Sequence, residues 1–93
     1  MTPILNELRT EIDSIDEKLV ELLNQRARCG LEIGRYKHKS HRPVLEPKRE
    51  AEVFANVARC NHGPLPNEEL ATIYATILAV MRRLQSPEHL ERS

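Results

Sequence analysis

The 93-residue sequence is long enough for one small domain and too short for two. Its 14 Lys+Arg and 14 Asp+Glu cancel to a formal net charge of zero. The chain therefore has no overall positive charge that would attract it to nucleic acid or to an anionic membrane. No apolar run is long enough to span a bilayer and no signal peptide is visible, so we expect a cytoplasmic protein. Three Gly and 3% aromatic residues favour an all-α fold over a β-sandwich or barrel.

The first predicted helix, from about Pro3 to about His38, carries an unusually long apolar seam. Its apolar residues recur at alternating steps of three and four, which is a sustained heptad pattern. Such a helix would be roughly 54 Å long, whereas a compact chain of this size has a radius of gyration of about 12 Å. One chain cannot cover this seam, so we expect a homodimer. The seam consists of Leu5, Leu8, Ile12, Ile15, Leu19, Leu22, Arg26, Cys29, Ile33 and Tyr36.

Two shorter helices are predicted after the central prolines. The second begins near Pro47, a favourable first-turn residue, and ends before Asn61-His62-Gly63-Pro64. The third begins with Asn67 as its N-cap and is stopped by Ser86-Pro87, after which we expect a frayed polar tail. The sequence therefore predicts a single three-helix domain over residues 1–93.

The cysteines and histidines form no pattern typical of a metal site or a nucleophile. Cys29 and Cys60 make no C-x-x-C pair, so we expect two free, partly buried thiols, with one disulfide between them as the alternative. The four histidines fall in predicted loops or in the tail, without metal-ligand spacing. We therefore expect no metal site and no nucleophilic catalysis.

The informative residues are polar side chains at positions where apolar ones are expected. Arg26 interrupts the seam of the first helix, and Lys37 lies three turns further along the same face. Arg26 could alternatively have a purely structural role, in which it fixes the register of the helices or extends its side chain until the guanidinium reaches water. Arg9 lies four heptads before Lys37, too far to reach the same pocket within one chain. In an antiparallel or crossed dimer, Arg9 could serve the partner's pocket.

The other two helices add polar groups to the same crevice. Glu46, Arg49 and Glu50 project from one side of the N-terminus of the second helix, which itself favours anions. Gln85 lies on the apolar face of the third helix. Taken singly, these residues could be explained by dipole matching, a solvated arginine and an exposed amide. Together they describe a mostly apolar crevice suited to a small molecule with two carboxylates and a hydroxyl.

One set of residues has a spacing that matches a known enzyme family: Leu8-Arg9, Ile12-Asp13, Ile15-Asp16, Leu19, Leu22, Arg26, Ile33-Gly34, Lys37 and Arg49-Glu50. In this spacing the sequence resembles the all-helical chorismate mutase family, over roughly Leu5 to Gln85. The resemblance implies an intertwined homodimer of three-helix protomers with two active sites built from both chains. It also implies a cofactor-free Claisen rearrangement of chorismate to prephenate in the biosynthesis of Phe and Tyr.

The resemblance further implies a role for each cation and for the amide. Arg26 and Arg49 of one chain and Arg9 of the other would bind the substrate carboxylates. Lys37 and Gln85 would donate hydrogen bonds to the ether oxygen, which gains negative charge as its bond breaks. Lys37, Gln85 and Arg26 are therefore the predicted catalytic residues.

Two carboxylates complete the implied site, and one position departs from the family pattern. Glu50 would accept a hydrogen bond from the ring hydroxyl, with the backbone near Glu46 close by. Glu46 replaces the usual Asp, a mild change if its role is through the backbone. Met81 stands where small or polar residues are common in the family and would alter the pocket wall.

Two other functions stay open at this point. The first is isochorismate pyruvate-lyase, a relative with similar pocket chemistry on the same fold. The second is a non-enzymatic helical dimerisation module, in which apolar residues could replace Arg26, Lys37 and Gln85 without loss of function. An assay on both substrates would separate these alternatives from a chorismate mutase.

Overall fold

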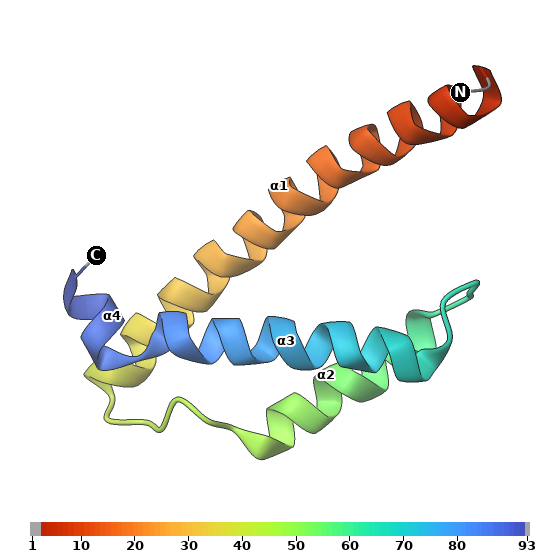
Figure 1. The fold of residues 1–93 in the computed structure, drawn as a ribbon. Coiled ribbons are helices and arrows are strands. Elements are labelled where there is room, and N and C mark those ends of the chain that lie inside the picture. The colour runs from red at the N-terminus through yellow and green to blue at the C-terminus, as the bar shows by residue number, and fades with distance from the viewer. Residues whose placement is uncertain (1–2, 93) are drawn as a thin grey trace.

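Residues 3–92, the part of the chain that this computed structural model describes, form four helices and the segments that join them. The helices are α1 (Pro3–Lys39), α2 (Pro47–Cys60), α3 (Asn67–Gln85) and α4 (Pro87–Arg92). These residues contain no strand, so the all-α prediction is confirmed. Figure 1 shows α1 as a long diagonal helix whose C-terminal end lies beside α3 and α4, while α2 lies along α3.

The three predicted helices are present, with one difference at the start of α3. α1 ends at Lys39, one residue beyond the expected end, and α2 begins at Pro47 as expected. Pro66 occupies the N-cap position of α3 and no side chain caps this end, so the prediction of Asn67 as N-cap is wrong. The Asn67 side chain has another partner, because its Oδ1 accepts a hydrogen bond from Asn61 Nδ2 at 2.7 Å. This bond joins the two ends of the α2–α3 loop.

Residues 87–92 form a helix, which corrects the expectation of a frayed tail there. Pro87 is the first residue of α4, a position that suits proline because a helix's first N–H has no intrahelical partner. Ser86 Oγ accepts a hydrogen bond from the His89 N–H at 3.3 Å, as a serine does at a helix N-terminus. α4 packs against both α1 and α3. The Ser-Pro pair thus ends one helix and begins the next, whereas the prediction used only its helix-ending property.

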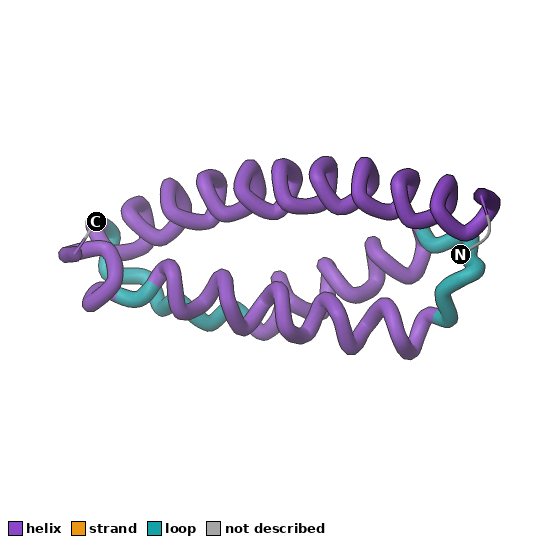
Figure 2. The backbone as a smooth tube through the Cα atoms, turned by 45° about the horizontal axis from the view of Figure 1, so that its top comes forward, coloured by secondary structure: helices purple, strands orange, loops and turns teal. Residues whose placement is uncertain are grey.

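The single chain is elongated, because α1 extends well beyond the other helices. The molecule measures 56 × 29 × 15 Å and has a radius of gyration of 16.7 Å, larger than the value of about 12 Å for a compact chain of this length. Figure 1 shows the N-terminal half of α1 apart from α2 and α3, and Figure 2 shows the middle of α1 on the opposite side of the molecule from them. Among residues 3–92, α1 contacts α3 and α4 and no other helix.

The apolar seam of α1 is consequently uncovered in the single chain. Ile12 is 54% exposed, Leu19 49% and Leu22 59%. Cys29 and Cys60 are free thiols, as expected, but they are exposed and not partly buried. Cys29 lies on the face of α1 that lines an open cavity, and Cys60 is the last residue of α2. No helix in the described part of the chain is long and apolar enough to cross a membrane.

Two glycines allow α1 and α3 to approach closely. Gly30 and Gly34 are both buried. A Cβ atom on Gly34 would lie 3.0 Å from the Cα and Cγ atoms of Gln85, closer than van der Waals contact allows. A Cβ atom on Gly30 would lie 3.3 Å from Met81 Sδ. The missing side chain at position 34 therefore places the last turn of α3, and Gln85 with it, directly against α1.

Candidate active site

A cavity of about 610 Å³ lies where the C-terminal part of α1, the start of α2 and the C-terminal half of α3 meet. Its apolar wall includes Ile33, Val53, Leu78 and Met81. Its polar lining includes six of the seven predicted site residues: Arg26, Lys37, Glu46, Arg49, Glu50 and Gln85. A half-apolar cavity with convergent cations is the usual form of a site for a small anionic ligand.

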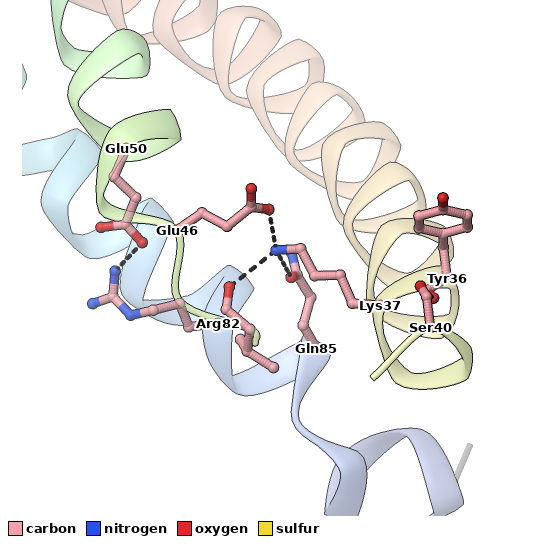
Figure 3. A network of polar contacts seen from close by, with 8 residues as sticks. Tyr36, Lys37, Ser40, Glu46, Glu50, Arg82 and Gln85 are labelled. Carbon is pink, nitrogen blue, oxygen red and sulfur yellow. Dashed lines mark hydrogen bonds and ion pairs between the residues drawn. The ribbon is translucent and has the colours of Figure 1, made fainter. Parts of the chain in front are cut away.

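Lys37 is at the centre of the polar network in this cavity (Figure 3). Only 7% of the residue is exposed. Its Nζ atom lies 3.0 Å from Val44 O, 3.1 Å from Gln85 Oε1 and 2.8 Å from Glu46 Oε1. A lysine ammonium has three protons to donate. The three acceptors therefore match its full capacity, which explains how a buried cation is tolerated here.

The contact with Lys37 also fixes the orientation of the Gln85 amide. Because an ammonium can only donate, the Gln85 atom that faces it must be the oxygen. The Nε2 group then remains as a donor, and it lies 3.8 Å from the position that a Cβ atom on Gly30 would take. Gly30 lines the cavity, so Lys37 and Gln85 together present one cation and one amide donor at its wall.

Glu46 connects the loop before α2 to Lys37. The hydrogen bond and the positive charge of Lys37, with the charges of Arg42 and Arg49 adding to them, hold the pKa of the Glu46 carboxyl below its ordinary value. Glu46 is therefore an anion at neutral pH. Its side chain is about half exposed, in contrast to that of Lys37.

Glu50 forms an ion pair with Arg82, which the sequence analysis did not single out. Arg82 Nη1 lies 2.5 Å from Glu50 Oε2, and both side chains line the cavity and are partly buried. A signal for Arg82 was present in the sequence. It lies four residues after Leu78 and three before Gln85, so it shares the face of α3 that carries both of them.

The three predicted carboxylate-binding arginines lie in different places. Arg26 is half-buried on α1 and lines the cavity. Arg49 is exposed at the start of α2, where it forms an ion pair with Glu52 at 3.5 Å. Arg9 is near the opposite end of α1 and does not line this cavity. The structure thus brings Arg26 and Arg49 together within one chain and leaves Arg9 apart from them.

Among the described residues, no cluster of three or more His, Cys, Asp or Glu side chains is placed to hold a metal ion, in this cavity or elsewhere. What they define is a small helical protein with a cation-lined cavity for a small anionic molecule. The family model described as "Chorismate mutase type II" matches residues 8–86. This chain belongs to the chorismate mutase type II family.

Individual relatives agree with this assignment. The chain is 41% identical over 88 residues to a bifunctional chorismate mutase/prephenate dehydratase of Pseudomonas aeruginosa, a match that covers 89% of this chain and 24% of the relative. The chain thus spans about a quarter of the length of that relative. It is also 37% identical over 86 residues to a 4-amino-4-deoxychorismate mutase of Streptomyces pristinaespiralis, covering 90% of this chain and 66% of the relative.

A solved structure has the same fold. The crystal structure of chorismate mutase from Helicobacter pylori in complex with prephenate matches with a TM-score of 0.83 and 31% sequence identity. The match covers 90% of this chain and 91% of that one. The similarity therefore extends over nearly the whole of both chains.

Proposed function

We propose that this chain is a chorismate mutase, which converts chorismate into prephenate in the biosynthesis of aromatic amino acids. The observation that carries the proposal is the Lys37–Gln85 pair, which presents two hydrogen-bond donors at the wall of a cation-lined cavity. The reaction is a unimolecular rearrangement in which one C–O bond breaks and one C–C bond forms. It needs no nucleophile, and this cavity offers none with an activating base.

The reaction has two requirements that the protein must meet. The substrate must be held in the compact conformer in which the reacting carbons are close, and the ether oxygen must be stabilised as it gains negative charge. The Nε2 group of Gln85 would donate to that oxygen directly, and Lys37 would turn one of its three protons from the half-exposed Glu46 to the oxygen. Because Val44 and Gln85 hold the ammonium in place before the reaction, the two donors stabilise the transition state at little cost of reorganisation.

The arginines and Glu50 would position the substrate. Arg26 and Arg49 would each bind a carboxylate, for which the planar guanidinium is well suited. Arg49 is exposed, so it can exchange its contact with Glu52 for one with substrate. Glu50 would accept a hydrogen bond from the ring hydroxyl, and the backbone near Glu46 lies at the same end of α2.

The active form is proposed to be an intertwined homodimer in the cytoplasm. The half-exposed seam of α1 is too long for the other helices of one chain to cover, and a second copy of α1 offers an equally long apolar seam. Arg9 lies at the end of α1 remote from the cavity of its own chain. In the dimer it would enter the cavity of the partner and complete the set of carboxylate-binding arginines.

A second substrate has a specific observation in its favour. The relative from Streptomyces pristinaespiralis is named a 4-amino-4-deoxychorismate mutase, and it matches nine-tenths of this chain. By its name, that substrate carries an amino group where chorismate has the ring hydroxyl. The two substrates therefore differ at the group that Glu50 is proposed to bind.

The proposal is tested by incubating the purified chain with chorismate and following the loss of chorismate and the appearance of prephenate. Isochorismate and 4-amino-4-deoxychorismate are assayed in parallel, and Lys37→Met serves as the inactive control. Rapid formation of prephenate by the wild type alone supports the proposal. Release of pyruvate from isochorismate with no turnover of chorismate would identify a lyase, and turnover of none of the three would leave a dimerisation module.

A further inference from the structure

The pair formed by Glu50 and Arg82 has no part in the mechanism given above, beyond the hydrogen bond that Glu50 is expected to accept. We propose that Arg82 is a specificity-determining residue: by neutralising the Glu50 carboxylate, it makes the site accept a substrate with a ring hydroxyl and reject one with an ammonium group there. This inference rests on the proposed function, because it assumes that Glu50 faces that substituent.

The geometry leaves Glu50 able to bind both partners at once. Arg82 Nη1 contacts Oε2, so Oε1 can accept a hydrogen bond from a ligand in the cavity. Both side chains line the cavity, with 23% of the Glu50 side chain and 37% of the Arg82 side chain exposed. Arg82 follows Leu78 by one turn on the packed face of α3, and Leu78 is buried. Packing of α3 against α2 therefore holds the guanidinium beside the carboxylate.

The charges then discriminate between the two substituents. A neutral hydroxyl can donate to an ionised carboxylate and gains a charge-assisted hydrogen bond. An ammonium group in the same place would lie roughly 5 Å from the guanidinium, about two hydrogen-bond lengths away. Arginine is always protonated, so the repulsion cannot be relieved by proton loss, and partial burial limits its screening. The carboxylate that would attract the ammonium group is already neutralised by Arg82.

The other charged groups of the cavity act in the same direction. The cations Arg26, Lys37, Lys48 and Arg49 also line it. Its two other carboxylates, Glu46 and Glu52, are paired with Lys37 and Arg49. A substrate with an additional positive charge therefore meets more cations than carboxylates in this cavity. Specificity by repulsion of the wrong ligand is a recognised means of discrimination.

The chain supplies a matched control in the neighbouring residue. Arg83 lies next to Arg82 on α3 but is exposed, and it is not among the residues that line the cavity. Replacing either arginine by methionine removes the same charge and keeps a long apolar stem. A difference between the two variants therefore reports on the position of the charge and not on the net charge of the protein.

The test measures kcat/KM for chorismate and for 4-amino-4-deoxychorismate in the wild type, Arg82→Met, Arg82→Lys and Arg83→Met. The readout is the ratio of the second value to the first. We expect Arg82→Met to raise this ratio by about tenfold or more, because the unneutralised Glu50 then attracts the ammonium group. Arg82→Lys should keep the ratio within about threefold of the wild type, because the charge is retained. Arg83→Met should leave both values unchanged.

A further variant keeps the test decisive if Arg82→Met fails to fold. Glu50→Gln leaves the guanidinium without its anion, so the ratio should fall below that of the wild type. A ratio that is the same in every folded variant overturns the role of Arg82, even if all variants lose activity equally, since a purely structural residue would act on both substrates alike. A wild type that turns over neither substrate contradicts the proposed function, and this inference with it.

Discussion

Lys37 Nζ on α1 and Gln85 Oε1 on α3 lie 3.1 Å apart, although 48 positions separate them along the chain. The contact exists because the two helices approach each other at Gly34, where no side chain keeps them apart. It aligns a buried ammonium with an amide whose NH₂ group remains available as a donor. The paired donors of the site are therefore a product of helix packing and not of either helix alone.

Removing either donor should reduce catalysis much more than binding. Lys37→Met and Gln85→Leu keep the apolar stems and should each lower kcat by roughly 10²–10³, equivalent to about 2.7–4 kcal/mol of transition-state stabilisation. Steady-state kinetics with chorismate measures this. Lys39→Met, an exposed lysine at the end of the same helix, is the control and should behave as the wild type. A folded Lys37→Met enzyme with nearly normal kcat would mean that the ether-oxygen role is wrong.

Alanine should be tolerated at position 30 but not at position 34. The Cβ atom of Gly34→Ala would meet the backbone and side chain of Gln85, so we expect a loss of about 1–3 kcal/mol in the free energy of unfolding, together with a lower kcat. The Cβ atom of Gly30→Ala would meet the flexible end of Met81 at 3.3 Å and Gln85 Nε2 at an ordinary contact distance of 3.8 Å, and the gain in helix propensity of about 1 kcal/mol should offset the closer contact. Urea unfolding and chorismate kinetics compare the two. Equal effects would show that the close approach at Gly34 is unimportant.

Replacing Glu46 by Gln should destabilise the fold at neutral pH but not in acid. Lys37 holds the pKa of the Glu46 carboxyl lower in the folded protein than in the unfolded chain. The contribution of the pair is therefore fully present above the unfolded pKa, about 4.3 for Glu, and is lost as the pH falls through the folded pKa.

Urea midpoints of wild type and Glu46→Gln, measured from pH 7 to about pH 3, should therefore converge in acid. The difference should be small, because Glu46 is half exposed. Glu52→Gln, which removes a more exposed pair with Arg49, is the control and should give a still smaller difference. A difference between wild type and Glu46→Gln that stays constant with pH would argue against the ion pair.

A charge on the α1 seam should separate the proposed dimer. Ile15 lies on the uncovered seam, 48% exposed in the single chain, whereas Glu17 lies on the other side of the helix. Ile15→Lys would bury a lysine in the dimer interface and should give a monomer at micromolar concentration, while Glu17→Lys should remain a dimer. Sedimentation equilibrium measures the mass of each. A wild-type chain that is a folded monomer under these conditions would exclude the shared active site.

Mixed dimers should show whether Arg9 acts in the partner's cavity. Arg9→Ala and Arg26→Ala should each be nearly inactive, since each removes a carboxylate-binding group from both sites. After exchange of subunits, a heterodimer of the two variants has one cavity with both wild-type arginines, so it should recover about one working site of the two. Activity is measured before and after exchange, with exchange verified by mass spectrometry of differently labelled chains. Verified heterodimers without recovery would show that Arg9 and Arg26 do not combine across the interface.

The helices and the membership of the cavity could be predicted from sequence because both depend on local rules. Proline positions gave the starts and ends of α2 and α3 within about one residue, and helical periodicity placed Arg26 and Lys37 on one face of α1. The same reasoning placed Gln85 on the packed face of α3, where it lies beside Lys37.

What sequence reasoning missed depends on packing between elements. Arg82 was passed over because its partner, Glu50, is 32 positions away on another helix, and no spacing rule joins them. The close approach at Gly34 depends on where α3 ends relative to α1, which periodicity does not give. α4 was missed because Ser86 and Pro87 signal both the end of one helix and the start of the next.

The continuity of α1 has a consequence for how the chain can change in length. Arg9 and Arg26 are 17 positions apart on one unbroken helix, which separates them by about 26 Å along its axis. One inserted residue between them would turn Arg9 by about 100° relative to Arg26, and seven inserted residues would restore its direction but move it by about 10 Å. In the proposed dimer, the number of residues in α1 is therefore constrained as tightly as their identity. Insertions and deletions are compatible with the fold in the loop over residues 61–66, which contributes no residue to the cavity.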